Sequence, residues 1–333
     1  MAYFGKFEIL AQCAKTGDSR VLAEYQDNLI LNNFFNSEKA AKDLNSLYCF
    51  FGTGSAPVTV NDTSLSSPIA EFISSPSYLN GSYTLREMVG GGLTHQVTIP
   101  FKASQGQIRG NISEIGLSLT PDQSGLMTRA LTKDSDGSPA AISVGEFDIV
   151  TVNYTIGMTI DSNETLVDTQ LLTIGGEQIT AELHWCDFNN NDKYPSLWIT
   201  GNSVDDGNII NNLRTTALHP AAYISSAFPF TGDITDYGNV YGKITPMDSM
   251  PSSMVYKSIG GELVAEITLI SDKGSHLGVW NGIIFSNQTS YPPGGSSLGS
   301  ATCLIKFTPP INKGANDIIK LTPLKFKTKR AAP

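Results

Sequence analysis

The sequence predicts an all-β fold made of two tandem antiparallel β-sandwich-like domains with few short helices. Apolar and polar residues alternate along several runs, which places one face of a strand on a core and the other toward solvent. Charged residues make up only 16% of the chain, against about 25% in average soluble proteins, so long charged helices are not expected. The alternating apolar positions are Val150, Val152, Tyr154 and Ile156; Ile179, Ala181, Leu183 and Trp185; and Leu263, Ala265, Ile267 and Leu269.

Short turns separate the alternating runs. Residues 15–18, 134–137, 205–208 and 271–274 each combine a Gly with Asp or Asn. Gly accommodates a positive φ, and Asp and Asn side chains bond nearby backbone groups. Strands joined by turns at this density favour antiparallel sandwiches. Helix signals are confined to residues 37–44, with Ser37 as the cap, and to residues 208–218.

A weak internal repeat divides the chain. Gly91-Gly92 followed by Val97-Thr98-Ile99 recurs as Gly260-Gly261 followed by Ile267-Thr268-Leu269. Residues 129–133 parallel residues 302–306, and Asp148-Ile149-Val150 parallels Asp317-Ile318-Ile319. A repeat of this length predicts two copies of one fold. We therefore expect an N-terminal β domain at residues 1–160 and a C-terminal β domain at residues 161–333, related by an internal duplication.

The charge distribution disfavours a nucleic-acid coat. The formal net charge is −9, whereas phosphate binding requires a basic surface. Basic residues nevertheless gather at the C-terminus, where Pro323 interrupts a lysine-rich run. Pro cannot donate to a strand ladder, and buried lysines need partners, so residues 318–329 are expected at an exposed sheet edge or a subunit contact. The lysines of this predicted assembly edge are Lys320, Lys325, Lys327 and Lys329.

Cysteine usage and hydropathy predict a protein made in a cytoplasm. The four cysteines, Cys13, Cys49, Cys186 and Cys303, form no CxxC pair, so free buried thiols are expected. Residues 1–10 lack the apolar core of a secretory leader, and no run of residues is long and apolar enough to cross a membrane.

No motif predicts an enzyme, a metal site or a cofactor. Gly295-Ser296-Ser297-Leu298-Gly299 matches a nucleophile elbow, but a Pro-rich loop precedes it and no His follows it. Residues 187–192 resemble the start of a calcium loop, yet Asp192 and Trp198 occupy the positions that need Gly and Glu. An ordinary turn is favoured, and a weakly bound cation stays open. The four histidines lack metal-ligand spacing.

One cluster of aromatic residues has two interpretations. Rigid aromatic side chains supply contact area in sugar- and protein-binding loops, but they also pin long loops to a core. The core interpretation is favoured, and the binding interpretation stays open. The candidate binding residues are Tyr223, Phe228, Phe230, Tyr237 and Tyr241.

Several spaced segments of the N-terminal half carry a resemblance to a known family. Phe51-Gly52-Thr53-Gly54-Ser55-Ala56-Pro57 precedes Asn61-Asp62-Thr63-Ser64-Leu65, and Ile112-Ser113-Glu114-Ile115-Gly116-Leu117 precedes Thr128-Arg129-Ala130-Leu131. Together with strands at residues 7–14, 21–25 and 148–156, this order resembles the tail-fibre and minor virion structural proteins of tailed bacteriophages. By their own chemistry, Gly52 and Gly54 permit a tight loop and Asn61-Asp62 caps a turn. Glu114 either pairs with Arg129 across neighbouring strands or is solvated.

The resemblance implies a β-rich component of a virion without catalytic residues. We expect a tail, fibre or appendage protein that self-associates and docks on neighbouring virion proteins, made in the host cytoplasm. A module that recognises a host-surface glycan and a capsid decoration protein are the alternatives. Partners would be other virion proteins and copies of the chain, with no direct nucleic-acid contact and no membrane insertion.

Overall fold

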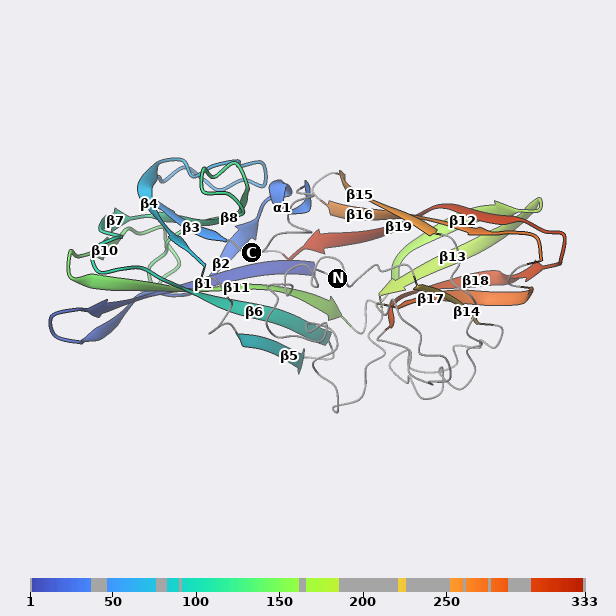
Figure 1. Cartoon of the computed structure of the whole chain (residues 1–333), viewed down its shortest axis with the longest axis horizontal. Coiled ribbons are helices and arrows are strands. Elements are labelled where there is room, and N and C mark those ends of the chain that lie inside the picture. Colours follow the sequence, from blue (N-terminus) through green and yellow to red (C-terminus); the bar gives the residue numbers. More distant parts are fainter. Residues whose placement is uncertain are drawn as a thin grey trace.

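The computed structural model describes residues 2–36, 47–75, 83–89, 92–161, 166–185, 221–225, 252–259, 262–274, 277–286 and 301–331. Strands account for 64% and helix for 2% of the described residues, which confirms the all-β fold class. Figure 1 shows two lobes in line, each built of long antiparallel strands. Among the described residues, no helix is long and apolar enough to span a membrane.

The strands alternate with short connections along both halves of the chain. The first half contains β1 (Ala2–Cys13), β2 (Ser19–Ile30), β3 (Tyr48–Gly52), β4 (Pro68–Ser74), β5 (Tyr83–Val89), β6 (Gly92–Lys102), β7 (Gly110–Ile112), β8 (Glu114–Ser118), β9 (Leu126–Leu131), β10 (Ile142–Val144) and β11 (Asp148–Asp161), together with helix α1 (Asn32–Asn36). The second half contains β12 (Leu166–Ile174), β13 (Glu177–Trp185), β14 (Ala221–Ser225), β15 (Ser252–Ile259), β16 (Glu262–Ser271), β17 (Gly278–Ser286), β18 (Ala301–Lys313) and β19 (Ile319–Arg330).

Eight strands of the first half pair in one antiparallel series. Their order is β5-β6-β11-β1-β2-β9-β8-β3, with β4 added outside β3. Strands β7 and β10 form a separate two-stranded sheet. Strands that are distant in sequence therefore lie side by side, and the core of this half contains residues from both of its ends.

The same strand order recurs in the second half. Strands β15, β16 and β19 form one run, and β12, β13, β18, β17 and β14 form the other. In chain order β12 to β19 thus correspond to β1, β2, β3, β5, β6, β8, β9 and β11. Strands β4, β7 and β10 have no counterpart among the described residues. The repeat in strand order is an observation, whereas a shared origin and a boundary at residue 160 stay predictions.

The two halves differ at one seam. In the first half β1 and β11 form a continuous ladder from Ala2↔Thr159 to Cys13↔Asp148. In the second half β12 and β19 touch, but no ladder joins them in the described residues. A side chain bridges the gap instead, because Gln170 Nε2 donates to the Lys325 carbonyl oxygen over 3.2 Å.

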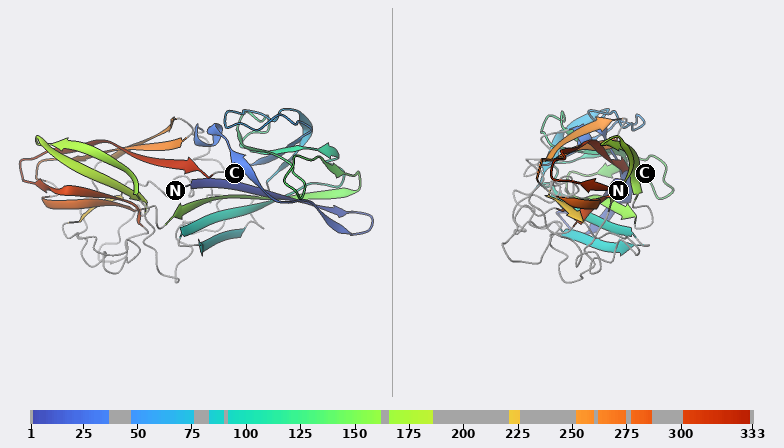
Figure 2. Two further views of the ribbon diagram at one scale, coloured as in Figure 1. Left: turned by 180° about the vertical axis from the view of Figure 1, so that it is seen from behind. Right: turned by 90° about the vertical axis from the view of Figure 1, so that its right-hand side faces the viewer.

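The last strand connects the two halves. The backbone of β19 pairs with β16 along most of its length and meets β1 in parallel at Ala2↔Lys329 and Tyr3↔Arg330. The Ala331 amide donates to the Tyr3 carbonyl at 2.7 Å, and Arg330 Nε donates to the Ile30 carbonyl at 2.6 Å. Both termini consequently lie at the middle of the molecule, and the β1–β2 and β12–β13 hairpins point to opposite ends (Figures 1 and 2).

In the strand order, the lysine-rich strand lies between β16 and β1. From Ile319 to Thr328 its described ladder partner is β16 alone, and at Lys329 and Arg330 it is β1, so its expected place at an exposed edge stays a prediction. Pro323 is accommodated because it falls at an irregularity, between the pairs Ile267↔Leu324 and Leu269↔Leu321, where the ladder register shifts. A role of the strand in subunit contact stays a prediction.

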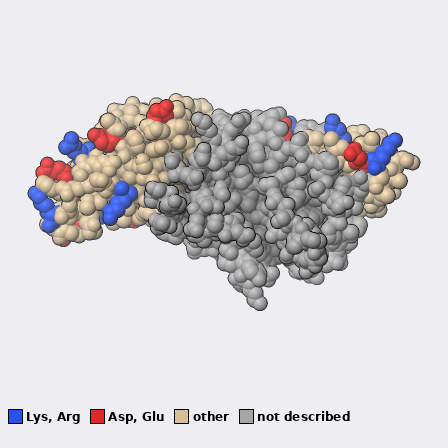
Figure 3. Space-filling model, viewed as in Figure 1, with Lys and Arg blue, Asp and Glu red and all other residues tan. Residues whose placement is uncertain are grey.

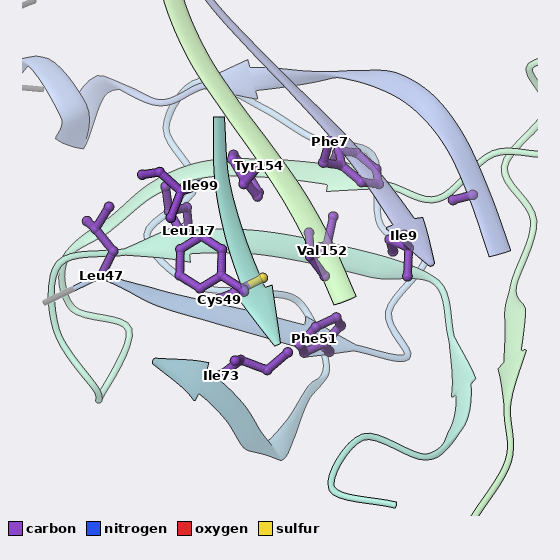
Figure 4. Packing of buried hydrophobic residues seen from close by; sticks show 14 of the residues in the cluster. Phe7, Ile9, Leu47, Cys49, Phe51, Ile73, Ile99, Leu117, Val152 and Tyr154 are labelled. Atoms are coloured by element: carbon purple, nitrogen blue, oxygen red, sulfur yellow. The ribbon is translucent and has the colours of Figure 1, made fainter. Parts of the chain in front are cut away.

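A large hydrophobic core fills the first half. The rings of Phe7, Phe101 and Tyr154 meet at centroid distances of 6.3 and 6.4 Å, and all three side chains are fully buried. Figure 4 shows the strands that carry Phe7 and Tyr154 packing over Cys49 and Phe51 from β3. Burial of this kind is the main favourable term in folding, at about 25 cal/mol for each Å² of apolar surface removed from water.

The predicted alternation is confirmed on β11 and modified on β16. Val150, Val152, Tyr154 and Ile156 are all buried. On β16, however, Val264 and Leu269 are both buried although they are five residues apart. The register shift between Ile267 and Leu269 explains this, because an irregularity exchanges the two faces of a strand.

The helix predictions are not tested by the described residues. Residues 37–44 and 208–218 both lie outside them. The described helix is α1, which precedes the first predicted segment and packs its Phe34 ring on Tyr3 at 5.4 Å.

Candidate functional site: a locked loop on the first half

Residues 53–67 form a loop that a buried ion cluster holds against the sheet; we call it the locked loop. Glu114 begins β8, and Arg129 lies on the neighbouring strand β9, where its Cα partner is Gly116. Alternate residues of a strand share one face, so this register brings the Glu114 and Arg129 side chains together on the loop side of the sheet. The alternative that Glu114 is solvated is wrong, because its side chain is completely buried.

Glu114 accepts hydrogen bonds from both ends of the locked loop. Its Oε1 accepts from the Gly54 amide at 3.1 Å and the Ser67 amide at 2.7 Å. Its Oε2 accepts from the Ser66 amide at 3.1 Å, and the Ser66 hydroxyl lies 3.2 Å from each oxygen. One carboxylate therefore closes the loop by holding its first and last residues together.

Arg129 completes the cluster from the other side. Its Nε and Nη2 donate to Glu114 Oε2 at 3.0 and 2.7 Å, while Nη1 donates to Asp62 Oδ2 at 2.6 Å. Nη2 also donates to the Ala56 carbonyl at 3.1 Å. Asp62 in turn accepts from the amide and hydroxyl of Thr59 at 3.0 and 2.7 Å, as expected of a turn cap. The guanidinium thus fixes the middle of the loop while Glu114 fixes its ends.

The cluster is charged in the folded protein. Burial opposes ionisation of Glu114, but the amides of Ser67 and Ser66 and the Arg129 guanidinium outweigh it and hold the pKa of this carboxyl below its ordinary value. Burial likewise opposes ionisation of Asp62, yet bonds from Thr59 and Arg129 lower its pKa. A buried charge cluster with every partner in place is strongly destabilised when one member is removed.

Two glycines make room for Glu114. Neither Gly52 nor Gly54 has a positive φ, so neither residue is needed for an unusual turn conformation. A Cβ at either position would instead collide with the Glu114 carboxylate, and at Gly54 also with Ser66. The predicted role of these glycines in a tight loop is thus replaced by one in packing.

A small apolar cluster anchors the same loop. Leu65 is buried and packs with Phe50, Leu126 and Leu31 on the outer face of the sheet, while its amide donates to Gln123 Oε1 at 3.2 Å. The inward side of the loop is therefore fixed by both charge and apolar contact, and its outward side carries none of these anchors.

Four of the segments that carry the phage resemblance meet in this cluster. Gly54 bonds to Glu114, Glu114 to Arg129 and Arg129 to Asp62, so residues up to 75 positions apart in the chain form one hydrogen-bonded series. Comparison of the chain with known protein families, with curated proteins and with solved structures found no match.

The candidate aromatic residues are not brought together by the described structure. Tyr223 lies on β14, where its Cα partner is Ile284. Phe228, Phe230, Tyr237 and Tyr241 lie outside the described residues. Glycan binding by this cluster stays a prediction.

The candidate lysines of β19 occupy varied surroundings. Lys320 is exposed, while Lys325 and Lys327 lie 3.9 Å from Glu266 and Asp168, respectively. Partly exposed pairs of this kind contribute about 0–1 kcal/mol. The backbone of Lys329 pairs with Ala2. Lys325 and Lys327 therefore have acidic neighbours within the second half itself.

The other candidate sites are only partly covered by the structure. The calcium-like turn at residues 187–192 and the Gly-Ser-rich segment at residues 295–299 lie outside the described residues. Where side chains are described, no group of three or more His, Cys, Asp or Glu could hold a metal. Cys13 and Cys49 are free thiols; Cys49 is buried, which raises its pKa, whereas Cys13 is half-buried.

Sequence reasoning missed two further polar groups in the first half. The Tyr154 hydroxyl bonds with Asn28 Nδ2 and Thr128 Oγ1 inside the core, and Arg20 holds Asp148 through two bonds of 3.0 and 2.6 Å. Thr128 begins one of the segments that carry the resemblance, but nothing in the spacing of Asn28 and Thr128 indicates that a tyrosine on β11 meets them. Strand pairing between distant residues creates these contacts.

Proposed function

We propose that this chain is a non-enzymatic structural component of a tailed-phage virion, a tail, fibre or appendage protein that docks on neighbouring virion proteins. The observation that carries the proposal is the convergence of the resembling segments on one cluster. Residues that match a family only because chance produced similar strands would be scattered over the fold. Here they are hydrogen-bonded partners, so they behave as one unit with one structural purpose.

The architecture supports an assembly role. Two β units in line make an elongated body whose ladders, among the described residues, end at β4, β5, β12, β14 and β15. Strands at the end of a sheet present backbone groups that neighbours can cover in an assembly. Copies of the chain and other particle proteins would both find such surfaces available.

The composition of the purified particle tests the proposal. Particles of the encoding phage are purified by density gradient, and their proteins are quantified by mass spectrometry against an abundant host protein as a contamination control. We expect the chain at a fixed copy number per particle, enriched over the host protein. Absence of the chain from intact, infectious particles would overturn the proposal.

A further inference from the structure

We propose that the locked loop is the surface through which the chain docks on a different virion protein, and that this partner presents an uncharged contact surface. The inference rests on the proposed function and specifies the part of the molecule that performs it. Its chemistry follows from the outward side of residues 53–67.

The outward side of the locked loop carries no free charge. Asp62 is the single charged residue in residues 53–67, and its carboxylate is engaged by Arg129. In Figure 3 the Lys and Arg of the described surface are interspersed with Asp and Glu. Nucleic acids and anionic membranes require clustered Lys or Arg, whereas the centres of protein interfaces are depleted of charge. The exposed residues of the loop are Thr53, Ser55, Ala56, Pro57, Thr59, Asn61, Thr63, Ser64, Ser66 and Ser67.

The loop is held in one conformation before any partner arrives. Glu114 fixes its ends, Arg129 and Asp62 fix its middle, and Leu65 anchors it to the sheet. Ordering a loop at an interface costs free energy that must be subtracted from affinity, so a loop already ordered binds more tightly for the same contacts. The hydroxyls of Thr59 and Ser66 take part in this lock, while the exposed side chains of Ser55, Thr63 and Ser64 are not used by it and are available for recognition.

The composition of the locked loop also favours a different protein as the partner over a second copy of the chain. Stable homodimer interfaces are large and more apolar than the rest of a protein surface. The exposed part of the locked loop offers Ala56 and Pro57 among small hydroxyl and amide side chains. A surface of this composition suits a polar contact with another protein. Helix α1 extends it, because Asn32 Nδ2 donates to Asn61 Oδ1 at 2.7 Å.

The decisive experiment places charge on the loop without touching its anchors. Ser55→Lys/Ser64→Lys alters two exposed residues whose side chains take part in none of the hydrogen bonds described above. The matched control, Asn312→Lys/Asn316→Lys, adds the same charge at exposed positions of the second half. Each variant is encoded on the phage, and its copies per particle are counted by mass spectrometry.

We expect Ser55→Lys/Ser64→Lys to lower incorporation on the order of tenfold or more, with an unchanged melting midpoint and an unchanged oligomeric state of the purified chain. The control should incorporate like the wild type. Binding of the wild-type chain to particles that lack it should vary little with salt, since few charges meet. If the double variant does not fold, Ser64→Lys alone replaces it.

Other results would overturn the inference. Normal incorporation of a folded loop variant would exclude the loop as the docking surface. The proposed function would still stand in that case, provided that the wild-type chain is present in the particle. Equal loss in the control, or loss of self-association in the loop variant, would also contradict it. Strong weakening of binding by salt would show that the partner surface is charged. Absence of the wild-type chain from particles would refute the proposed function itself.

Discussion

The two halves share one strand order but are closed in different ways. In the first half the long β1–β11 ladder joins the sheet into a continuous series, and the Glu114–Arg129–Asp62 cluster fixes a loop on its outer face. In the second half β12 and β19 are joined by side chains across an open seam. Its last strand instead continues to β1 of the first half.

The two halves together show which residues the strand arrangement requires and which residues the locked loop requires. Strand β17, which corresponds to β8 in the strand order, contains no acidic residue. The same strand order thus forms without this acid–base pair. We infer that the pair stabilises the locked loop and is not required by the eight-stranded arrangement.

Deletion of residues 318–333 should have the largest effect on the difference between the halves. It removes the ladder partner of β16 together with the buried residues Ile319, Leu321 and Leu324, so we expect the second half to lose its folded structure. The first half keeps its β1–β11 ladder. Hydrogen exchange measured by mass spectrometry should show rapid exchange in β12–β18 and continued protection in β1–β11. Unchanged protection of the second half would show that β19 is dispensable.

Glu114→Gln should destabilise the first half alone. The substitution leaves Arg129 with a neutral partner inside the protein, and loss of one member of a buried pair costs about 3–5 kcal/mol. Denaturant unfolding followed by exchange in each half measures the loss. Lys306→Gln is the matched control, because it breaks the exposed cross-strand pair with Glu182 on the second half and should cost about 0–1 kcal/mol. A similar loss from both variants would contradict the comparison.

Acid should unfold the first half, and the pH at which it unfolds should depend on three of its carboxyl groups. Glu114, Asp62 and Asp148 all have a lowered pKa in the folded protein, with Arg20 offsetting burial at Asp148. The unfolded chain therefore takes up protons first, at the ordinary pKa of about 4. Their contribution to stability is complete above that pH and is lost as the pH falls through the lower folded values.

The measurement is the melting midpoint of each half from neutral pH downward. We expect the midpoint of the first half to fall steeply below about pH 4, and the slope to be shallower in Glu114→Gln, which has one proton fewer to take up. An identical slope in the variant would show that Glu114 does not contribute to acid unfolding.

Arg330→Met should produce the smallest effect, at the junction. It removes the donors to the Ile30 carbonyl and to Asn32 Oδ1, which link the end of β19 to the first half. A lost bond to a charged group costs about 1.5–3 kcal/mol, and here the cost falls on the coupling between halves. We expect the two halves to unfold at more widely separated denaturant concentrations, with Arg330→Lys intermediate. Joint unfolding in Arg330→Met would place the coupling elsewhere, such as at the Tyr3–Phe34 contact.

The sequence by itself determined the fold class, because alternation on β11 and β13 and the glycine turns act over a few residues. Gly17, Gly137 and Gly274 all have the positive φ that their turn segments predict. Local alternation also placed Val150, Val152 and Ile179 on a buried face. Such patterns follow from neighbours along one strand, and they need no knowledge of which strands pair.

Only the tertiary structure decided where the distant segments meet. The spacing of Glu114 and Arg129 left their pairing open, since the register of β8 and β9 sets whether the two side chains meet. The same holds for Gly54 and Asp62, which reach the cluster through the path of the loop. The lysine-rich strand shows the same limit: Pro323 disfavours a central strand locally, but a register shift accommodates it, and the end of β19 pairs with β1. Contacts between residues that are far apart in the chain depend on pairing across the whole sheet, and local sequence does not encode that pairing.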